Sequence, residues 1–282
     1  MTFLTADPVT LLAFAALAVA LIPVAQLVFL GLGRLQGFSV TGETALRANP
    51  AVGIRNAAYL LSVVIAFQGV ARTGGESLRA DLLALASYAL LAIVLLAISG
   101  IVNDKLILYR WDNNREVVRE GNVGVALVEG ATYFATALIM VGAAGSSDPA
   151  TTEILWFVIG QAVLVALAFV YQVIVPGVHH QLDDHNLACG ISLAGLLASG
   201  GIALGAAVSG PSQGWAEDAM NTGAYLLGWL VFMLVAMLIA NRVILPSANL
   251  RQQVMELRNV AAGVIEAATF VAFTLLYLFV TG

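Results

Sequence analysis

The chain has 282 residues, of which 60% are hydrophobic and only 10% are charged, and its formal net charge is −5. A soluble domain carries about 25% charged residues, so this chain has too few polar groups to cover a globule in water. The acidic balance argues against nucleic-acid binding, which requires a basic face. The single cysteine, Cys189, excludes an intrachain disulfide. We therefore expect an integral membrane protein.

Eight apolar runs have the length of about 20 residues that a helix needs to cross a bilayer. They are too long for the strands of a membrane barrel, which alternate in and out over about ten residues. The predicted fold is thus all-α, a polytopic membrane protein with eight transmembrane helices. The runs are approximately Leu11–Leu32, Asn49–Val70, Asp81–Val102, Asn122–Ala143, Glu153–Val175, Asn186–Val208, Met220–Ile244 and Asn259–Val280.

The distribution of Lys and Arg predicts the orientation, because cytoplasmic loops are enriched in both. The loops on one side hold only Arg72 and Arg79. The loops after the first, third, fifth and seventh runs hold Arg34, Arg47, Lys105, Arg110, Arg115, Arg119, Arg242, Arg251 and Arg258. We therefore expect these loops in the cytoplasm and both termini outside.

The chain contains an internal repeat. A shift of 137 residues aligns Asn49–Gly145 with Asn186–Gly282 without a gap, and polar residues match at several positions. Four helices per unit is an even number, so both units enter the membrane in the same direction. The predicted domains are two parallel-oriented four-helix repeats, residues 1–145 and 146–282. Functional sites are expected at the interface between the repeats, or once in each repeat.

A glutamate interrupts an apolar run in each repeat, in NVGVALVEGATYFA and in NVAAGVIEAATFVA. An asparagine seven residues earlier shares its helix face, and a threonine follows it by three residues. A charged residue at a helix centre costs about 2.5–3.5 kcal/mol on insertion scales, so it needs a partner, a proton or a water-lined cavity. One interpretation is a proton or cation site. The other is a structural glutamate that joins two helices by hydrogen bonds.

Arg55 lies six residues into the second run, at a depth similar to that of Glu129 in the fourth. We expect these two side chains to form an ion pair. The second repeat has Ser192 at the matching position, so Glu266 would lack this partner. The alternative is that Arg55 extends to the lipid head groups. The candidate ion or proton site comprises Glu129, Glu266, Asn122, Asn259, Thr132, Thr269 and Arg55.

An asparagine opens the second and fourth helix of each repeat: Asn49, Asn122, Asn186 and Asn259. The simpler interpretation is the helix N-cap, in which the side-chain oxygen accepts a hydrogen bond from a free backbone N–H. The other is an anion or head-group site built from converging helix N-termini, with Asn49 and Asn186 completing it.

Two polar loops offer further candidates. In His179–His185, histidine and aspartate recur at a spacing of four, which on a helix could bind zinc. The first repeat has no histidine there, and a polar linker is the alternative, so no metal or other cofactor is expected. The longest loop, Asn103–Gly121, is predicted to be a solvated amphipathic segment on the membrane face. Gly201 and Gly205 predict close helix packing.

Two pairs of segments resemble a known family. ANPAVGIRNAAYLLSVVIAFQGV and HNLACGISLAGLLASGGIAL are similar to its first motif, N-x-A-x-(A/G)-I followed by small residues. GNVGVALVEGATYFATALI and RNVAAGVIEAATFVAFTLL resemble its second, N-(V/T)-A. The family is the bacterial inner-membrane group termed domain of unknown function 350, here in two tandem copies. The resemblance implies a four-helix unit and an inner-membrane location, and little about activity. Arg55 departs from the small or apolar residue expected at its position, whereas Ser192 fits.

The sequence supports two functions of different classes. The first is a small ion- or proton-linked transporter or channel that uses the buried glutamates. The second is a non-transporting membrane scaffold whose charged loops dock a cytoplasmic partner or lipid. An enzyme is not expected, because no nucleotide-binding loop, nucleophile elbow or metalloprotease motif is present. The lipid bilayer is the expected partner, a homo-oligomer is left open, and nucleic acid is excluded.

Overall fold

The computed structural model describes the chain except for residues 1–7, 73–76, 110–111, 145–148, 211 and 245–248. Within this described part, eight helices are long and apolar enough to cross a membrane, as the sequence predicts. They are α1 (Pro8–Leu35), α2 (Pro50–Ala66), α3 (Leu78–Val102), α4 (Val123–Ala143), α5 (Pro149–Ile174), α7 (Leu187–Ala207), α8 (Trp215–Ile239) and α10 (Val260–Thr281). The short segment η3 (Phe67–Arg72) extends α2.

Short helical segments join these long helices at one end of the molecule, which we call the loop-helix end. Four are single turns of π-helix or short α-helix that precede an inner helix, and η4 and η6 extend α3 and α8. They are η2 (Gly42–Leu46), η4 (Asn103–Ile107), η5 (Arg115–Arg119), α6 (Val178–Asp183), η6 (Ala240–Ile244) and α9 (Leu250–Met255).

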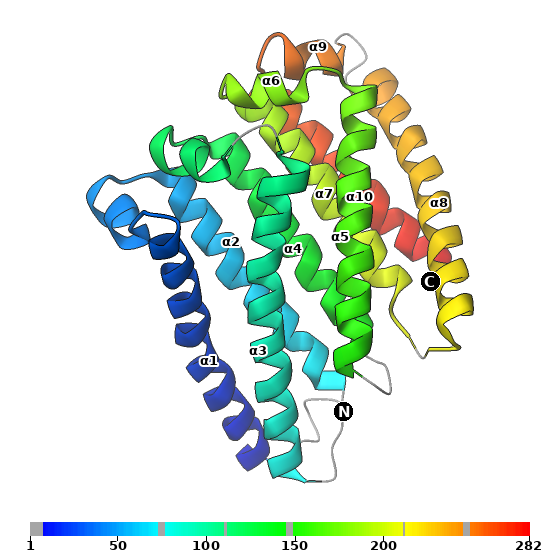
Figure 1. Cartoon of the computed structure of the whole chain (residues 1–282). Coiled ribbons are helices and arrows are strands. Elements are labelled where there is room, and N and C mark those ends of the chain that lie inside the picture. The colour runs from blue at the N-terminus through cyan, green and yellow to red at the C-terminus, as the bar shows by residue number, and fades with distance from the viewer. Residues whose placement is uncertain (1–7, 73–76, 110–111, 145–148, 211, 245–248) are drawn as a thin grey trace.

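The eight long helices form four helical hairpins. Each consists of an outer helix, a loop helix and an inner helix: α1–η2–α2, α3–η5–α4, α5–α6–α7 and α8–α9–α10. The inner helices contact one another in the order α2, α4, α7, α10 and form a continuous row. The outer helices α1, α3, α5 and α8 pack on one side of that row. All four inner helices start at the loop-helix end, where α6 and α9 are visible in Figure 1.

The same backbone motif begins every inner helix. A residue of positive φ follows each loop helix, at Ala48, Gly121, His185 and Arg258. Positive φ is uncommon outside glycine, and three of these four residues are not glycine. The next residue is the N-cap asparagine, whose side-chain oxygen accepts from backbone N–H groups of its helix at Asn49, Asn122, Asn186 and Asn259. The capping interpretation of these asparagines therefore holds.

The two repeats meet where α4 packs against α7, and glycines make the contact close. A β-carbon at Gly190 would lie only 2.4 Å from the Cα of Gly124. One at Gly201 would lie 2.3 Å from the Cα of Ala135. Because these neighbours are backbone atoms, the two helices could not keep this distance with larger residues. Gly205 contacts α4 in the same way, so the predicted close packing of Gly201 and Gly205 is present.

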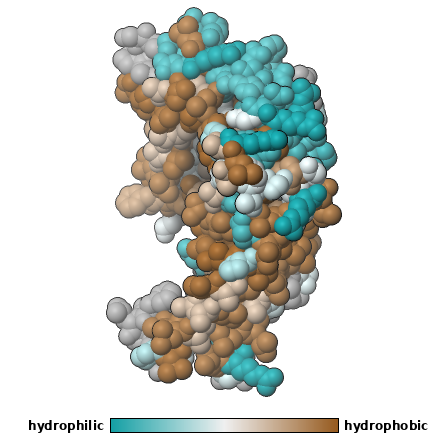
Figure 2. All heavy atoms as spheres, turned by 90° about the vertical axis from the view of Figure 1, so that its left-hand side faces the viewer, coloured by the Kyte–Doolittle hydropathy of each residue, from teal (hydrophilic) through white to brown (hydrophobic). Residues whose placement is uncertain are grey.

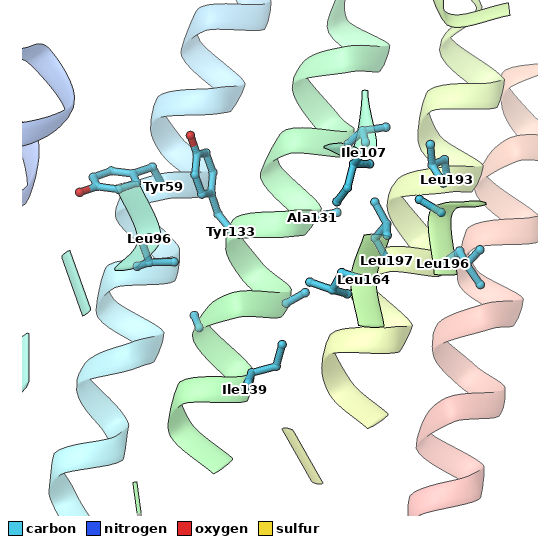
Figure 3. Close-up of a cluster of buried hydrophobic side chains, with 14 of the residues drawn as sticks. Tyr59, Leu96, Ile107, Ala131, Tyr133, Ile139, Leu164, Leu193, Leu196 and Leu197 are labelled. Carbon is cyan, nitrogen blue, oxygen red and sulfur yellow. The ribbon is translucent and has the colours of Figure 1, made fainter. Parts of the chain in front are cut away.

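The hydrophobic core follows the row of inner helices. Figure 3 shows Tyr59 and Tyr133 side by side in the first repeat, and Leu193, Leu196 and Leu197 along α7. The rings of Tyr59 and Tyr133 lie 5.6 Å apart, edge to face. Seen from the side of α1, the surface is mostly hydrophobic below a hydrophilic cap (Figure 2). This pattern is that of a multi-pass membrane protein.

The expectation of a solvated loop at Asn103–Gly121 is wrong for much of its length. The side chains of Ile107, Leu108, Asn113, Glu116 and Val117 are buried. The segment folds back as η4 and η5 over the ends of the first-repeat helices, and its polar residues reach the interior. Charged residues such as Arg115 and Arg119 remain exposed.

Candidate functional site

The first repeat contains the expected ion pair. Arg55 on α2 lies 3.5 Å from a carboxylate oxygen of Glu129 on α4, and both side chains are almost fully buried. The same guanidinium donates to the Oδ1 of Asn114 at 3.0 Å. It also lies over the ring of Phe38, 5.2 Å from the centroid. Arg55 therefore points inward, and the alternative of a side chain reaching the head groups is wrong.

A chain of amides extends this pair toward Thr132. Asn113 donates to Glu129 at 3.4 Å and to Asn103 at 3.0 Å. Asn103 donates in turn to Thr132 at 2.6 Å. Asp104 accepts from the backbone N–H of Asn113 at 2.8 Å and fixes the loop in place. The ion pair is thus held by residues of the folded-back loop, which sequence reasoning did not identify.

Glu266 in the second repeat has a different environment. Ser192 donates to its carboxylate at 2.5 Å, and the hydroxyl of Tyr171 lies 2.7 Å from that of Ser192. Because Ser192 uses its proton toward Glu266, Tyr171 donates to Ser192. Among the described residues no cationic side chain forms an ion pair with Glu266, although this residue is only 8% exposed. The predicted difference between the two repeats is therefore present.

Each glutamate lines a cavity that opens toward the loop-helix end. The cavity in the first repeat has a volume of about 360 Å³ and is lined by Arg55, Asp104, Lys105, Asp112 and Glu129, among others. The cavity in the second repeat has a volume of about 620 Å³ and lies between α5, α8, α9 and α10. Its polar lining is Tyr171, Asn241, Arg242, Asn249, Arg251 and Glu266. The two cavities are repeat equivalents, since matching residues are 137 positions apart.

The residues at these matching positions differ in size and charge. Ser192 and Val175 stand in the second repeat where Arg55 and Phe38 stand in the first. Small side chains there leave more space, which accounts for the larger cavity beside Glu266. The polar rim also changes sign: Asp104 and Asp112 correspond to asparagines, and Asn114 corresponds to Arg251.

The other candidate residues lie apart from the carboxylates. Asn122 and Asn259 form no hydrogen bond with the glutamate seven residues later on their helix, and their part in an ion or proton site stays a prediction. Thr269 donates to the carbonyl of Ile265 within α10. The four asparagines cap helices that stand in a row, and the alternative of a converging ring around an anion is wrong. Asn49 and Asn186 serve as caps.

The histidine-rich loop forms α6. His180 lies 3.4 Å from Asp184, and Arg258 contacts the same aspartate at 2.7 Å. Within the described residues no group of three or more His, Cys, Asp or Glu side chains could hold a metal ion. His179 is buried and stacks edge to face on Tyr109.

The model of one protein family matches almost the whole chain. Its description is Domain of Unknown Function (DUF350), and it matches residues 3–144 and 147–278. The chain belongs to the DUF350 family. It contains two tandem DUF350 units, as the two motif pairs predict, and Glu129 and Glu266 lie at matching positions of the two units. Comparison of this DUF350 chain with curated proteins and with solved structures found no match.

Proposed function

We propose that this DUF350 protein is an ion- or proton-linked transporter or channel of the bacterial inner membrane, with Glu266 as its ion-binding residue. The observation that carries the proposal is the cavity of about 620 Å³ that leads from the loop-helix end to Glu266. A carboxylate inside a membrane protein is functional by default where it lines a water-accessible cavity. No catalytic role is part of the proposal.

Glu266 suits this role better than Glu129 does. The charge of Glu129 is balanced by Arg55 at 3.5 Å, and a buried pair of this kind is costly to break. Glu266 is held by a neutral hydroxyl, so its carboxylate can take a proton or a small cation without displacing a charged partner. The hydroxyls of Ser192 and Tyr171 supply further oxygen atoms beside it. Hard cations prefer such oxygen ligands.

The proposed orientation places the loop-helix end in the cytoplasm. Arg47, Arg115, Arg119, Arg251 and Arg258 all lie at that end of the described structure, on or next to its short helices. Arg79 lies at the start of α3, at the opposite end. With this orientation Glu266 is reached from the cytoplasm, and α1 begins and α10 ends on the outer side.

One observation favours the alternative function, a scaffold without transport. The Arg55–Glu129 pair, with its asparagines, ties α2, α4 and the folded-back loop together, which is a structural use of a buried carboxylate. If Glu266 served only to join α10 to α7 through Ser192, the charged loop helices would be the functional surface, available to a cytoplasmic partner or to lipid.

Flux measurements in proteoliposomes distinguish these functions. Proton and K⁺ flux would be recorded for the wild type, Glu266→Gln and Glu217→Gln, in which an exposed glutamate at the other end of the molecule is neutralised as a matched control. The proposal predicts flux above empty liposomes in the wild type and Glu217→Gln, and at least a tenfold reduction in Glu266→Gln. No wild-type flux from well-folded protein would favour the scaffold.

A further inference from the structure

One hydrogen bond recurs at every junction between neighbouring hairpins. Asn49 donates its side-chain N–H groups to the carbonyls of Val117 and Val118 in the second hairpin, both at 3.0 Å. In the same way Asn122 donates to Leu182 in the third hairpin at 2.7 Å, and Asn186 donates to Val254 in the fourth at 2.8 Å. Each capping asparagine therefore binds the loop helix of the next hairpin in the row.

The hairpins at the two ends of the row lack this hydrogen bond on their outward side. Asn259 caps α10 and donates to Gln253 of its own hairpin at 2.8 Å. The side-chain amide of Asn259 has two N–H donors, and only one of them is used in the bond to Gln253. Asn259 is also exposed. At the other end, Thr44 and Ala45 lie five and four residues before Asn49, the spacing of the acceptors at the internal junctions. Both are exposed, and no side chain of the described structure donates to their carbonyls.

The helices at the internal junctions pack through small residues in one register. We number each inner helix from its capping asparagine as position 0. The residue at position 2 of one helix packs against the residue at position 4 of the next, as Gly124 of α4 does against Gly190 of α7. A β-carbon at Gly263 would likewise lie 2.5 Å from the carbonyl oxygen of Ala188. The residue at position 9 of one helix likewise packs against the residue at position 8 of the next. A β-carbon at Gly130 of α4 would lie 2.9 Å from the β-carbon of Ala58 of α2.

Small residues also occur at the ends of the row, where no helix of the described structure covers them. Positions 2 and 9 of α10 are Ala261 and Ala268, and both are exposed. Positions 4 and 8 of α2 are Gly53 and Ala57. A β-carbon at Gly53 meets nothing within 4 Å, and Ala57 is exposed. The last inner helix therefore carries the donor side of a junction, and the first carries the acceptor side.

We propose that this protein assembles head to tail, with α10 of one copy packed against α2 of the next. Asn259 then donates to the carbonyl of Thr44 or Ala45 in the next copy, and Ala261 faces Gly53. The contact uses different surfaces on the two copies, so it is heterologous and produces a closed ring or an open filament. The inference is independent of ion transport.

This junction is expected to be weaker than the internal contact between α4 and α7. Gly142, Gly201 and Gly205 bring those two helices together far from the loop-helix end. The matching positions at the ends of the row, 137 residues away, are Phe279, Val64 and Gln68. Copies are therefore close near the loop helices and further apart elsewhere, so their association depends on protein concentration in the membrane.

The first test is native mass spectrometry of the full chain from nanodiscs or detergent. Gly53→Leu fills the proposed contact, and a β-carbon at this position meets no atom of its own chain within 4 Å. Gly223→Leu is the matched control, because a β-carbon at Gly223 on the outer helix α8 also meets nothing within 4 Å. Wild type and Gly223→Leu should give dimers and larger species, and Gly53→Leu should need at least tenfold more protein to do so. A monomeric wild type, or an unchanged Gly53→Leu, would overturn the proposal.

The second test asks whether the contact is head to tail. In a Cys189→Ala background, chains carrying Ala261→Cys are coexpressed with chains carrying Gly53→Cys and oxidised in membranes. The mixture should give a disulfide-linked dimer, each variant alone should not, and one chain with both substitutions should give a ladder. Dimers from Ala261→Cys alone would instead show a two-fold contact through α10, and equal cross-linking of Ala261→Cys to Leu83→Cys would show random collision. Either result contradicts the proposal.

Discussion

Ser192 occupies the position in α7 that Arg55 occupies in α2, and each side chain contacts the glutamate on the last helix of its own repeat. Arg55 lies 3.5 Å from Glu129, and Ser192 donates to Glu266 at 2.5 Å. A cation therefore stands beside one carboxylate, and a neutral hydroxyl beside the other. The two repeats thus carry sites at equivalent positions and of different charge.

Removing Arg55 should destabilise the protein strongly. Arg55→Ala leaves Glu129 buried without its cation, and breaking a buried pair in this way costs about 3–5 kcal/mol. Thermal unfolding in detergent would measure the loss, with the exposed Arg119→Ala as control. The double variant Arg55→Ala with Glu129→Ala should be no less stable than Arg55→Ala. Strictly additive losses would show that the two side chains are not coupled.

The equivalent caps should differ in their contribution to stability. Asn122→Ala removes a cap, typically about 1 kcal/mol, and also the hydrogen bonds that its amide donates to the carbonyl of Leu182 and to the buried carboxylate of Glu116, about 1–3 kcal/mol more. Asn259→Ala in the isolated chain removes only the cap and a bond to Gln253. Denaturant unfolding at low protein concentration should rank Asn122→Ala as the more damaging change. Equal losses would show that the bond between hairpins contributes nothing.

Alanine at Gly201 should destabilise although alanine favours helices. Helix propensity alone would gain about 1 kcal/mol. The added β-carbon would, however, lie 2.3 Å from the Cα of Ala135, and overpacking of this kind costs about 1–3 kcal/mol. Gly223→Ala, where the β-carbon meets nothing, should show only the gain. A thermal shift of the same sign in both variants would contradict the close packing of α4 and α7.

Labelling of single cysteines would test the proposed orientation. In a Cys189→Ala background, Ser212→Cys lies between α7 and α8 at one end, and Arg119→Cys lies at the loop-helix end; both positions are exposed. Because basic loops stay in the cytoplasm, a membrane-impermeant maleimide added to spheroplasts should label Ser212→Cys only. Arg119→Cys should react after lysis. The reverse pattern would place the loop-helix end outside.

The sequence was sufficient for the eight helices, the repeat and the difference between Arg55 and Ser192, because hydropathy and a constant shift of 137 residues carry that information. The four-hairpin row was not predictable in this way. Its capping asparagines are separated by unequal intervals, from Asn49 to Asn122 and from there to Asn186, so no single shift aligns the hairpins. The residues of positive φ before them share no side-chain type.

The environment of Glu129 was also beyond sequence reasoning. Asn103, Asn113 and Asn114 belong to a stretch rich in charge, which periodicity assigns to the solvated surface. Asn113 and Asn114 reach Glu129 and Arg55, with Asn103 bonded to Asn113, only because η4 and η5 fold back over the helix ends and bury Ile107 and Val117. This fold-back is a tertiary arrangement, which the local sequence pattern does not predict.

The most direct test of the central claim, that Glu266 is a carboxylate free to exchange its ion, is proton flux through Ser192→Arg in proteoliposomes. This substitution gives the second repeat the cation that the first repeat holds in Arg55, and the cavity of about 620 Å³ beside Glu266 has room for it. The account predicts a folded protein whose flux falls at least tenfold below that of the wild type, as in Glu266→Gln. Wild-type flux through folded Ser192→Arg would contradict it.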